Sequence, residues 1–463
     1  MTAIVASIAF VVVGITLVAL VERGRTVSGA ALIGHSLGLG LSGMAGGLLL
    51  LSLLGLVPQP LSAGGICIAG ILTLWQLKRR QQLLRLAAVP PAARPAGSTM
   101  AVGLVVASLV VALVAMRHGF MDAGLDAIAI WGLKAKAVYL APLRDAPVFR
   151  APGFSFSHLQ YPLLVAFQLA AAYVWAGSPH VATGQVVFVL AYGGMGALAY
   201  AAARERLRPW PAAILALALA WLPAQMQMAC FGYADTFFVL ACLGNAWAAW
   251  RYLEHGERRD LVYFALYGAA LALTKTEGLV TVAIHGTLLL ALTPGRRPRL
   301  AVLAAGAVLL AAIAPVWLWL LSIPAHEPSF SQNLNVAFIG ANTDRLGYIL
   351  RAWFQQMTTW RYWGGWFFLP LVVAVLGPAA WRRRGTWWLW AALLGQAAFY
   401  CLVYLITPRD LAWHVRDSIG RLFLHLTPLV FLIAVAHLSD LMPAAAVPAP
   451  AEPEPADDAA DAG

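Results

Sequence analysis

The chain has 463 residues, of which 61% are hydrophobic and 11% are charged, and its mean hydropathy is +0.76. This composition excludes an ordinary series of soluble domains and is typical of proteins that cross a membrane many times. The net charge of +11 comes largely from short arginine clusters between apolar runs. The positive-inside rule expects such clusters, so we exclude nucleic acid as a partner.

Long apolar runs recur from the N-terminus to about residue 440. In hydrocarbon each segment has to satisfy its own backbone hydrogen bonds, and the runs lack the strict alternation of a membrane β-barrel. We therefore expect an all-α polytopic membrane protein. The four cysteines have no metal-ligand spacing, so we read them as small buried hydrophobic residues and expect no metal site.

The arginine clusters also predict the topology. The loops expected to be cytoplasmic are 22–25, 78–94, 204–208, 251–260, 296–299 and 382–384. Three apolar runs, rather than two or four, separate the second loop from the third. We expect the run at 160–176, which is short and flanked by prolines, not to cross. About thirteen transmembrane helices result, with the N-terminus extracytoplasmic and the C-terminus cytoplasmic.

Three parts follow from this topology. Residues 1–99 form an N-terminal three-helix extension and a cytoplasmic linker, and residues 100–440 form the main transmembrane domain, with juxtamembrane helices in a long extracytoplasmic loop. Residues 441–463 are a Pro/Ala/acidic tail that we expect to be disordered. The first apolar run has no basic segment before it and no small-residue cleavage site after it, so we expect a retained span.

The first long loop carries the charged sequence "MRHGFMDAGLDAIAIWGLKAKAVYL" at 116–140. Asp122 and Asp126 are four residues apart, so both carboxylates lie on one face of a helix and repel each other. Such a pair suits a general base. The alternative is an ordinary solvated helix face.

Two more polar stretches lie at the predicted outer ends of spans. "FGYADTFF" places Asp235 at the start of a helix, where it is either a functional carboxylate or a group that stabilises the helix N-terminus. "LALTKTEGLV" places Lys275 and Glu277 between two short apolar runs, which indicates a turn sunk below the outer surface. There Lys275 would hold a phosphate and Glu277 would orient it or a sugar hydroxyl. The alternative is local charge balance in a tight turn.

The last apolar run begins with "WHVRDSIGRLFLHLTP". Arg421 and His425 share a helix face there, and Arg421 is either an anion ligand or an interfacial side chain that extends to water. We read the histidines as structural, hydrogen-bonded residues. The tryptophan-rich loop at 322–365 is typical of an aromatic belt at the membrane interface, with a lid as the alternative.

Taken in chain order, "LDAIAIWGLKAKA", "YPLL", "GYAD", "TKTEG" and "GRLFLHLTP" resemble the GT-C superfamily of membrane glycosyltransferases. The resemblance is to bacterial proteins similar to protein O-mannosyltransferases and the lipid A aminoarabinose transferase, and it covers roughly residues 100–430. It implies a GT-C-like core in the bacterial inner membrane. The implied partners are a polyprenyl-phosphate-linked sugar donor, an acceptor glycan, lipid or protein, and the membrane lipids.

The resemblance also implies roles for particular residues. The first-loop carboxylate falls on Asp126, the second-loop carboxylate on Asp235, and a buried lysine on Lys275. Better-known members often have two adjacent acids where this chain has Asp126 and Ala127. This leaves open whether Asp122 or Asp126 is the base, gives no support to a bound divalent cation, and leaves us expecting no cofactor. The predicted substrate-binding residues are Trp131, Lys134, His158, Tyr161, Lys275, Glu277 and Arg421.

The predicted reaction is transfer of the sugar to an acceptor hydroxyl at the extracytoplasmic face, with Asp126 as base and inversion at the sugar carbon. The main alternative is a transporter or flippase of a lipid-linked saccharide, for which paired half-helices at mid-membrane would be expected. A ligase or polymerase that uses a lipid diphosphate donor is the third reading.

Overall fold

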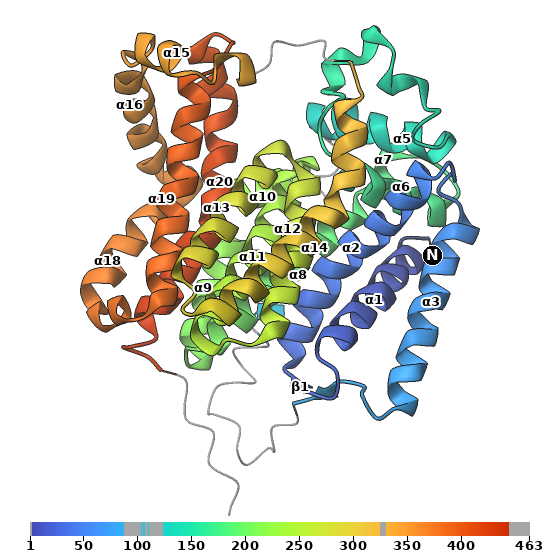
Figure 1. Ribbon diagram of the computed structural model, residues 1–463, viewed down its shortest axis with the longest axis horizontal. Helices are drawn as coiled ribbons and strands as arrows, with labels where there is room; N and C mark the ends of the chain where they lie inside the picture. Colours follow the sequence, from blue (N-terminus) through green and yellow to red (C-terminus); the bar gives the residue numbers. More distant parts are fainter. Residues whose placement is uncertain are drawn as a thin grey trace, which may run out of the picture.

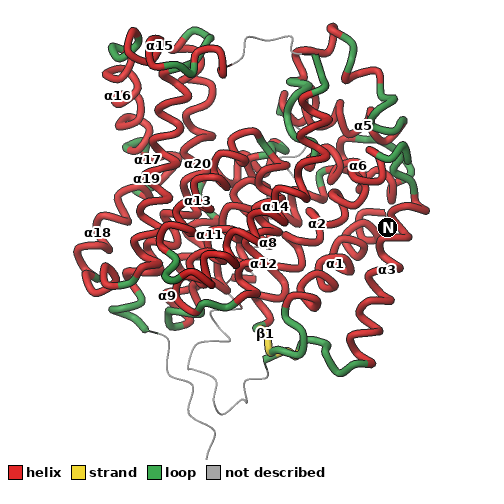
Figure 2. Tube along the Cα trace, in the orientation of Figure 1, coloured by secondary structure: helices red, strands yellow, loops and turns green. Residues whose placement is uncertain are grey.

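The computed structural model describes residues 2–87, 103, 105, 106, 110, 124–324 and 330–443. Within these ranges the regular structure is helical apart from two short strands (Figure 2). The all-α, multi-pass membrane fold expected from the sequence is confirmed at this level. Asp122, most of the apolar run at 100–116 and the tail from residue 444 onward lie outside the described residues.

The helices follow the order of the apolar runs. The N-terminal part holds α1 (Thr2–Val21), β1 (Thr26–Val27), α2 (Gly29–Leu53), α3 (Pro60–Arg79) and β2 (Arg85–Leu86). The loop after residue 124 holds η2 (Ala127–Gly132), α5 (Leu133–Leu140), η3 (Pro147–Phe149) and η4 (Pro152–Ser157). The middle of the chain holds α6 (Leu164–Ala176), α7 (Val181–Gly184), α8 (Val186–Arg204), α9 (Pro209–Ala220), α10 (Pro223–Phe231), α11 (Asp235–His255), α12 (Arg258–Thr274), α13 (Thr276–Leu292) and α14 (Arg296–Leu321).

The C-terminal part begins with a loop that carries several short helices. It holds η5 (Phe330–Asn333), α15 (Val336–Ala341), α16 (Arg345–Met357), α17 (Trp360–Trp363), η6 (Trp366–Phe368), α18 (Leu369–Leu376), η7 (Pro378–Arg382), α19 (Arg384–Leu405) and α20 (Leu411–Leu438). Figure 1 shows α15 and α16 at one end of the bundle and β1 at the opposite end.

Seven of the described helices are long and apolar enough to cross a membrane. The number is eight if α9 and α10, which meet at an angle of 52°, form one broken span. Three shorter apolar helices, Leu164–Ala176, Thr276–Leu292 and Trp366–Leu376, fall below that length. The total of about thirteen spans, which assumes that short and partly polar helices also cross, stays a prediction.

Helix α6 corresponds to the run that we expected not to cross. Its 13 residues span about 20 Å, less than the roughly 30 Å of a hydrocarbon core. It leads through α7 into α8, and Phe188 in the first turn of α8 lies next to Gly232, which in turn lies next to Ala127. The first turn of α8 therefore lies near the start of the first outer loop, and the prediction that α6 does not cross the membrane stays a prediction.

The loops predicted to be cytoplasmic meet at one end of the bundle. Strands β1 and β2 pair in parallel, which joins the first of these loops to the second. Arg25 forms an ion pair with Glu257 at 2.5 Å, and Arg259 forms one with Glu22 at 2.6 Å, so the first loop also contacts the 251–260 loop. We name this the inner end, after the sequence-based prediction, and the opposite end the outer end.

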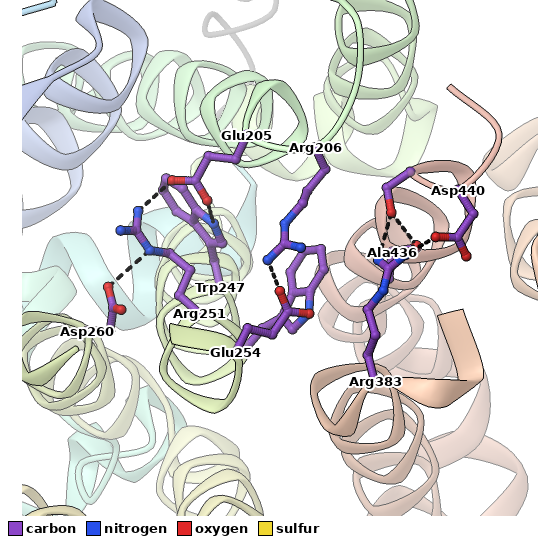
Figure 3. Close-up of polar contacts among 11 residues, drawn as sticks. Glu205, Arg206, Trp247, Arg251, Glu254, Asp260, Arg383, Ala436 and Asp440 are labelled. Atoms are coloured by element: carbon purple, nitrogen blue, oxygen red, sulfur yellow. Dashed lines mark hydrogen bonds and ion pairs between the residues drawn. The ribbon is translucent and has the colours of Figure 1, made fainter. Parts of the chain in front are cut away.

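Further ion pairs close the inner end (Figure 3). They join Arg251 with Glu205 and Asp260, Arg206 with Glu254, and Arg383 with Asp440. Arg251 lies 2.6 Å from the Glu205 carboxylate and 3.0 Å from that of the buried Asp260, so one guanidinium on α11 joins the residue that follows α8 to α12. The clusters that predicted the topology therefore also tie the helices together at this end.

The N-terminal extension packs into the main bundle. On α2, the ring of His35 stacks between Trp247 and Tyr263, at centroid distances of 5.2 and 4.2 Å, and its Nδ1 lies 3.0 Å from the Tyr267 hydroxyl. These contacts place α2 against α11 and α12. The first three helices are thus one body with the helices that carry the candidate site.

Candidate functional site

An ion pair between Asp126 and Arg421 forms the first part of the candidate site. Asp126 directly precedes η2 in the first outer loop, and Arg421 lies on α20, 295 residues further along the chain. Both side chains are about a quarter exposed, at 24% and 23%. The Nε atom of Arg421 is buried and has no hydrogen-bond partner among the described residues. The guanidinium therefore has a donor that no described protein group uses.

The first loop is fastened to the α10–α11 turn. The backbone N–H of Gly124 donates to the Phe231 carbonyl at 3.0 Å, and a side chain at Gly124 would collide with the ring of Tyr233. The Arg421 guanidinium lies 5.8 Å from the centre of that ring. Burial and then the Asp126 charge raise the pKa of Tyr233, whereas Arg421 acts to lower it. Tyr233 therefore lies in the field of the ion pair and keeps its proton.

Asp235, which is buried, forms the second part of the site. Its Oδ1 atom accepts a hydrogen bond from Lys275 Nζ at 3.0 Å and lies 2.8 Å from His425 Nε2. The side chains of all three residues are almost fully buried. The other ring nitrogen of His425 lies 3.1 Å from the Tyr400 hydroxyl, and the ring stacks on Phe238. Asp235, the first residue of α11, is thus held by Lys275 from the break between α12 and α13 and by His425 of α20.

A break between two helices places Lys275 beside Asp235. Helix α12 ends at Thr274 and α13 begins at Thr276, with Lys275 alone in an extended conformation (φ −147°, ψ 158°). A helix cannot continue through such a residue, so the chain reverses there. Gly278 lies directly against the Leu271 backbone, where a Cβ atom would clash with the carbonyl. The small residue therefore allows the two helices to pack closely just behind the lysine.

An aromatic wall lies next to these ion pairs. Tyr161 stacks on the His158 ring at 4.8 Å and faces Trp131 at 6.1 Å between centroids. Lys134 is buried, with its Nζ 5.6 Å from the centre of each of the Trp131 and Tyr161 rings, and it donates to the His158 carbonyl at 2.6 Å. Burial lowers the pKa of Lys134 to about 7. Lys134 thus binds the protein's own backbone.

Tyr161 connects this wall to the charged residues. Burial and then the charge of Glu277 raise the pKa of its phenol, while Arg421 acts in the opposite direction. Glu277 lies in the first turn of α13, directly after the break at Lys275. The wall, the Asp126–Arg421 pair and the start of α13 therefore form one neighbourhood at the outer end.

The structure brings most of the predicted site residues together. They are Asp126, Trp131, Lys134, His158, Tyr161, Asp235, Lys275, Glu277 and Arg421. Their roles stay predictions. The Lys134 ammonium group donates to the His158 carbonyl and does not face a cavity open to a substrate. Asp122 lies outside the described residues.

Two residues of this neighbourhood, His425 and Tyr233, are not among the predicted site residues. The sequence predicts a structural role for His425, although its spacing from Arg421 places both residues on the same helix face. It contacts Asp235 directly. Tyr233 lies inside the "GYAD" motif, two residues before Asp235, but a tyrosine at a predicted span end is typical of the membrane interface and gave no further signal.

The absence of a metal site stays a prediction. Among the residues that the structure describes, no group of three or more His, Cys, Asp or Glu side chains could hold a metal ion. The carboxylates of Asp126 and Asp235 are instead neutralised by Arg421 and Lys275. A cationic side chain thus lies next to each of the two acids.

The comparison with known families bears on this same region. Residues 160–319 match the profile of the dolichyl-phosphate-mannose-protein mannosyltransferase family. The matched segment is about a third of the chain and includes Tyr161, Asp235, Lys275 and Glu277, while Asp126 and Arg421 lie outside it. No curated protein and no solved structure matches the chain. The similarity is to a GT-C-type family, as the sequence motifs implied.

Proposed function

We propose that this protein is a GT-C-type membrane glycosyltransferase that uses a polyprenyl-phosphate-linked sugar as donor. The proposal rests above all on the Asp126–Arg421 pair, in which a partly exposed carboxylate meets a guanidinium with an unused donor. The profile match over 160–319 supports it from an independent part of the chain. The acceptor is a hydroxyl of a glycan, lipid or protein at the extracytoplasmic face of a bacterial inner membrane.

In the proposed reaction, the acceptor hydroxyl attacks the anomeric carbon of the sugar while Asp126 removes its proton. The new carbon–oxygen bond forms as the bond between the sugar and the lipid phosphate breaks, and the electron pair leaves with the phosphate. A single displacement of this kind inverts the anomeric configuration. A well-placed base supplies roughly 10²- to 10⁴-fold in rate.

The departing phosphate needs positive charge close by. The Arg421 guanidinium, whose side chain is 23% exposed, would donate to a phosphate oxygen, and the buried Lys275 would add the charge of a second cation. Donors fixed in place before the reaction stabilise developing charge without reorganisation. When the Arg421 guanidinium binds the phosphate, the ion pair with Asp126 breaks. The Asp126 carboxylate is then available to the acceptor hydroxyl.

Asp235 has a different role in this proposal. Its carboxylate is 2% exposed and its Oδ1 is already engaged by Lys275 and His425, so an acceptor hydroxyl has no direct access to it. We assign it as a positioning residue that holds Lys275 and His425 in place. Asp126 is therefore preferred over Asp235 as the base.

The test is a transfer assay with the purified full-length protein and a panel of labelled polyprenyl-phosphate sugars, with product separated by thin-layer chromatography. Asp126→Asn should lower kcat by at least about 100-fold. Asp344→Asn removes an exposed acid from the loop before α16 and serves as the control. Parental activity in both Asp126→Asn and Asp122→Asn would contradict the mechanism, and a product that retains the donor configuration would exclude single displacement.

A further inference from the structure

A cationic cavity lies at the outer end, and neither Asp126 nor Arg421 lines it. Its volume is about 350 Å³, and it is formed by the loop around η3 and by the end of α14 with the residues that follow. Phe149 and Trp319 meet edge to face at 5.1 Å and form part of its lining. Arg144 and Arg150 supply its charge.

The two arginines are poorly neutralised. Arg144 has Asp145 at 3.6 Å, but both side chains are more than half exposed, so this pair contributes little. No ion pair or hydrogen bond joins the exposed Arg150 side chain to any other described residue. An apolar lining with two guanidiniums at its edge is suited to an anion that carries hydrocarbon.

The cavity lies where a membrane-facing helix ends. Leu310, Leu318 and Leu321 of α14 are each at least 60% exposed, as expected for side chains that face lipid. The helix ends at Leu321, and Ser322 and Ile323 already line the cavity. Under the predicted topology the end of α14 marks the outer membrane surface, so the two guanidiniums would lie near the lipid headgroups.

We propose that this cavity binds the phosphate of an anionic phospholipid in the outer leaflet, between Arg144 and Arg150. The fatty-acid chains would lie along the exposed leucines of α14, and the headgroup would rest against Phe149 and Trp319. A volume of about 350 Å³ is within the range of small-molecule sites. The proposal does not depend on the transferase activity.

The N-terminal extension contacts two residues that line this cavity. The Leu143 N–H donates to Ser52 Oγ at 2.8 Å in a buried hydrogen bond, and Gly55 lies against the Arg144 guanidinium. On the other side, Gln160 donates to the Ile323 carbonyl at 3.2 Å. A bound lipid would therefore brace the extension, the first outer loop and the segment that carries Tyr161.

The experiment is native mass spectrometry of the full-length protein in detergent, titrated with phosphatidylglycerol, phosphatidylcholine and inorganic phosphate in separate arms. Parental protein should bind phosphatidylglycerol in preference to phosphatidylcholine. Arg144→Gln/Arg150→Gln should weaken phosphatidylglycerol binding by at least about ten-fold, since two charge-assisted contacts are lost. Arg144→Lys/Arg150→Lys, which keeps both charges, should retain more than the glutamine variant.

Arg351→Gln is the matched control, because Arg351 is an exposed arginine on α16 and does not line the cavity. Thermal unfolding of each variant reports whether the fold is intact. Equal phosphatidylglycerol binding by the parental protein and the folded glutamine variant would overturn the proposal. Equal losses in Arg351→Gln, or inorganic phosphate binding as tightly as phosphatidylglycerol, would also overturn it.

Discussion

At the scale of single residues, two aspartates at the outer end differ in what surrounds them. Asp126 is partly exposed and has one cationic partner, whereas Asp235 is sealed between Lys275 and His425. A carboxylate that receives a proton from a substrate needs access to it. A carboxylate that is enclosed by partners instead fixes their positions, and this contrast underlies the two roles proposed above.

The buried Asp235–Lys275 pair should contribute to the stability of the fold. Asp235→Asn leaves the buried Lys275 without its counter-charge, and breaking a buried pair on one side typically costs about 3 to 5 kcal/mol. We expect a lower free energy of unfolding in detergent, measured by denaturant titration. Adding Lys275→Met to Asp235→Asn should recover part of the loss. If Asp235→Asn alone is as stable as the parent, the pair is not a stabilising contact.

The burial of Lys134 should make the free energy of unfolding depend on pH. Burial lowers its pKa to about 7, and an unfolded lysine titrates near about 10.4. Between these values the unfolded chain binds more protons than the folded protein, so the free energy of unfolding should rise with pH. Below about pH 7 both states are protonated, and this dependence ends.

The rise should be at most about 1.4 kcal/mol per pH unit, measured by denaturant titration between about pH 7 and pH 9. Lys134→Met should lack it, while Lys136→Met, on the exposed side of α5, should keep it. A Lys134→Met variant with the same slope as the parent would show that another group is responsible.

At the scale of secondary-structure elements, the break between α12 and α13 brings Lys275 to Asp235, and Gly278 allows it. Gly278→Ala would place a Cβ atom on the Leu271 carbonyl, so α13 has to move away from α12 and carry Lys275 with it. We expect transfer activity to fall about as far as in Lys275→Met. Gly286→Ala on the same helix is the control, because its nearest neighbour would be Phe264 at 3.8 Å. Equal activity in the two alanine variants would contradict this account.

Some features of the helices could be predicted from the sequence. Short apolar runs on either side of "TKTEG" predicted a turn near Lys275, and the length of the 160–176 run predicted a helix that stays in one leaflet. Both rest on segment length and on nearby turn-forming residues, which can be read from a sequence. The helix bounds at Thr274 and Thr276 confirm the turn at Lys275, whereas the one-leaflet position of the 160–176 run stays a prediction.

The pairing of side chains could not be read in the same way. His425 contacts Asp235 across 190 residues, and Asp126 meets Arg421 across 295. Such contacts depend on the depth and rotation of each helix in the bundle, which one apolar sequence does not determine. The resemblance placed Asp126, Asp235 and Lys275 in one site, yet it gave no partner for any of them.

At the scale of the whole molecule, the inner end is closed by ion pairs and the outer end carries the candidate site. Single cysteines in a cysteine-free background test this orientation. Asn342→Cys, next to α15, should react with a membrane-impermeant maleimide in intact cells, whereas Arg297→Cys at the inner end should react only after permeabilisation. The opposite labelling pattern would reverse the proposed topology.

The central claim is that Asp126 and Arg421 act as one unit in sugar transfer. The most direct test is a double-mutant cycle on kcat with the parental protein, Asp126→Asn, Arg421→Gln and the combined variant. Residues that act together show non-additive losses, so the combined variant should be about as slow as the slower single variant. If the two losses multiply, the pair does not share a function and the account is contradicted.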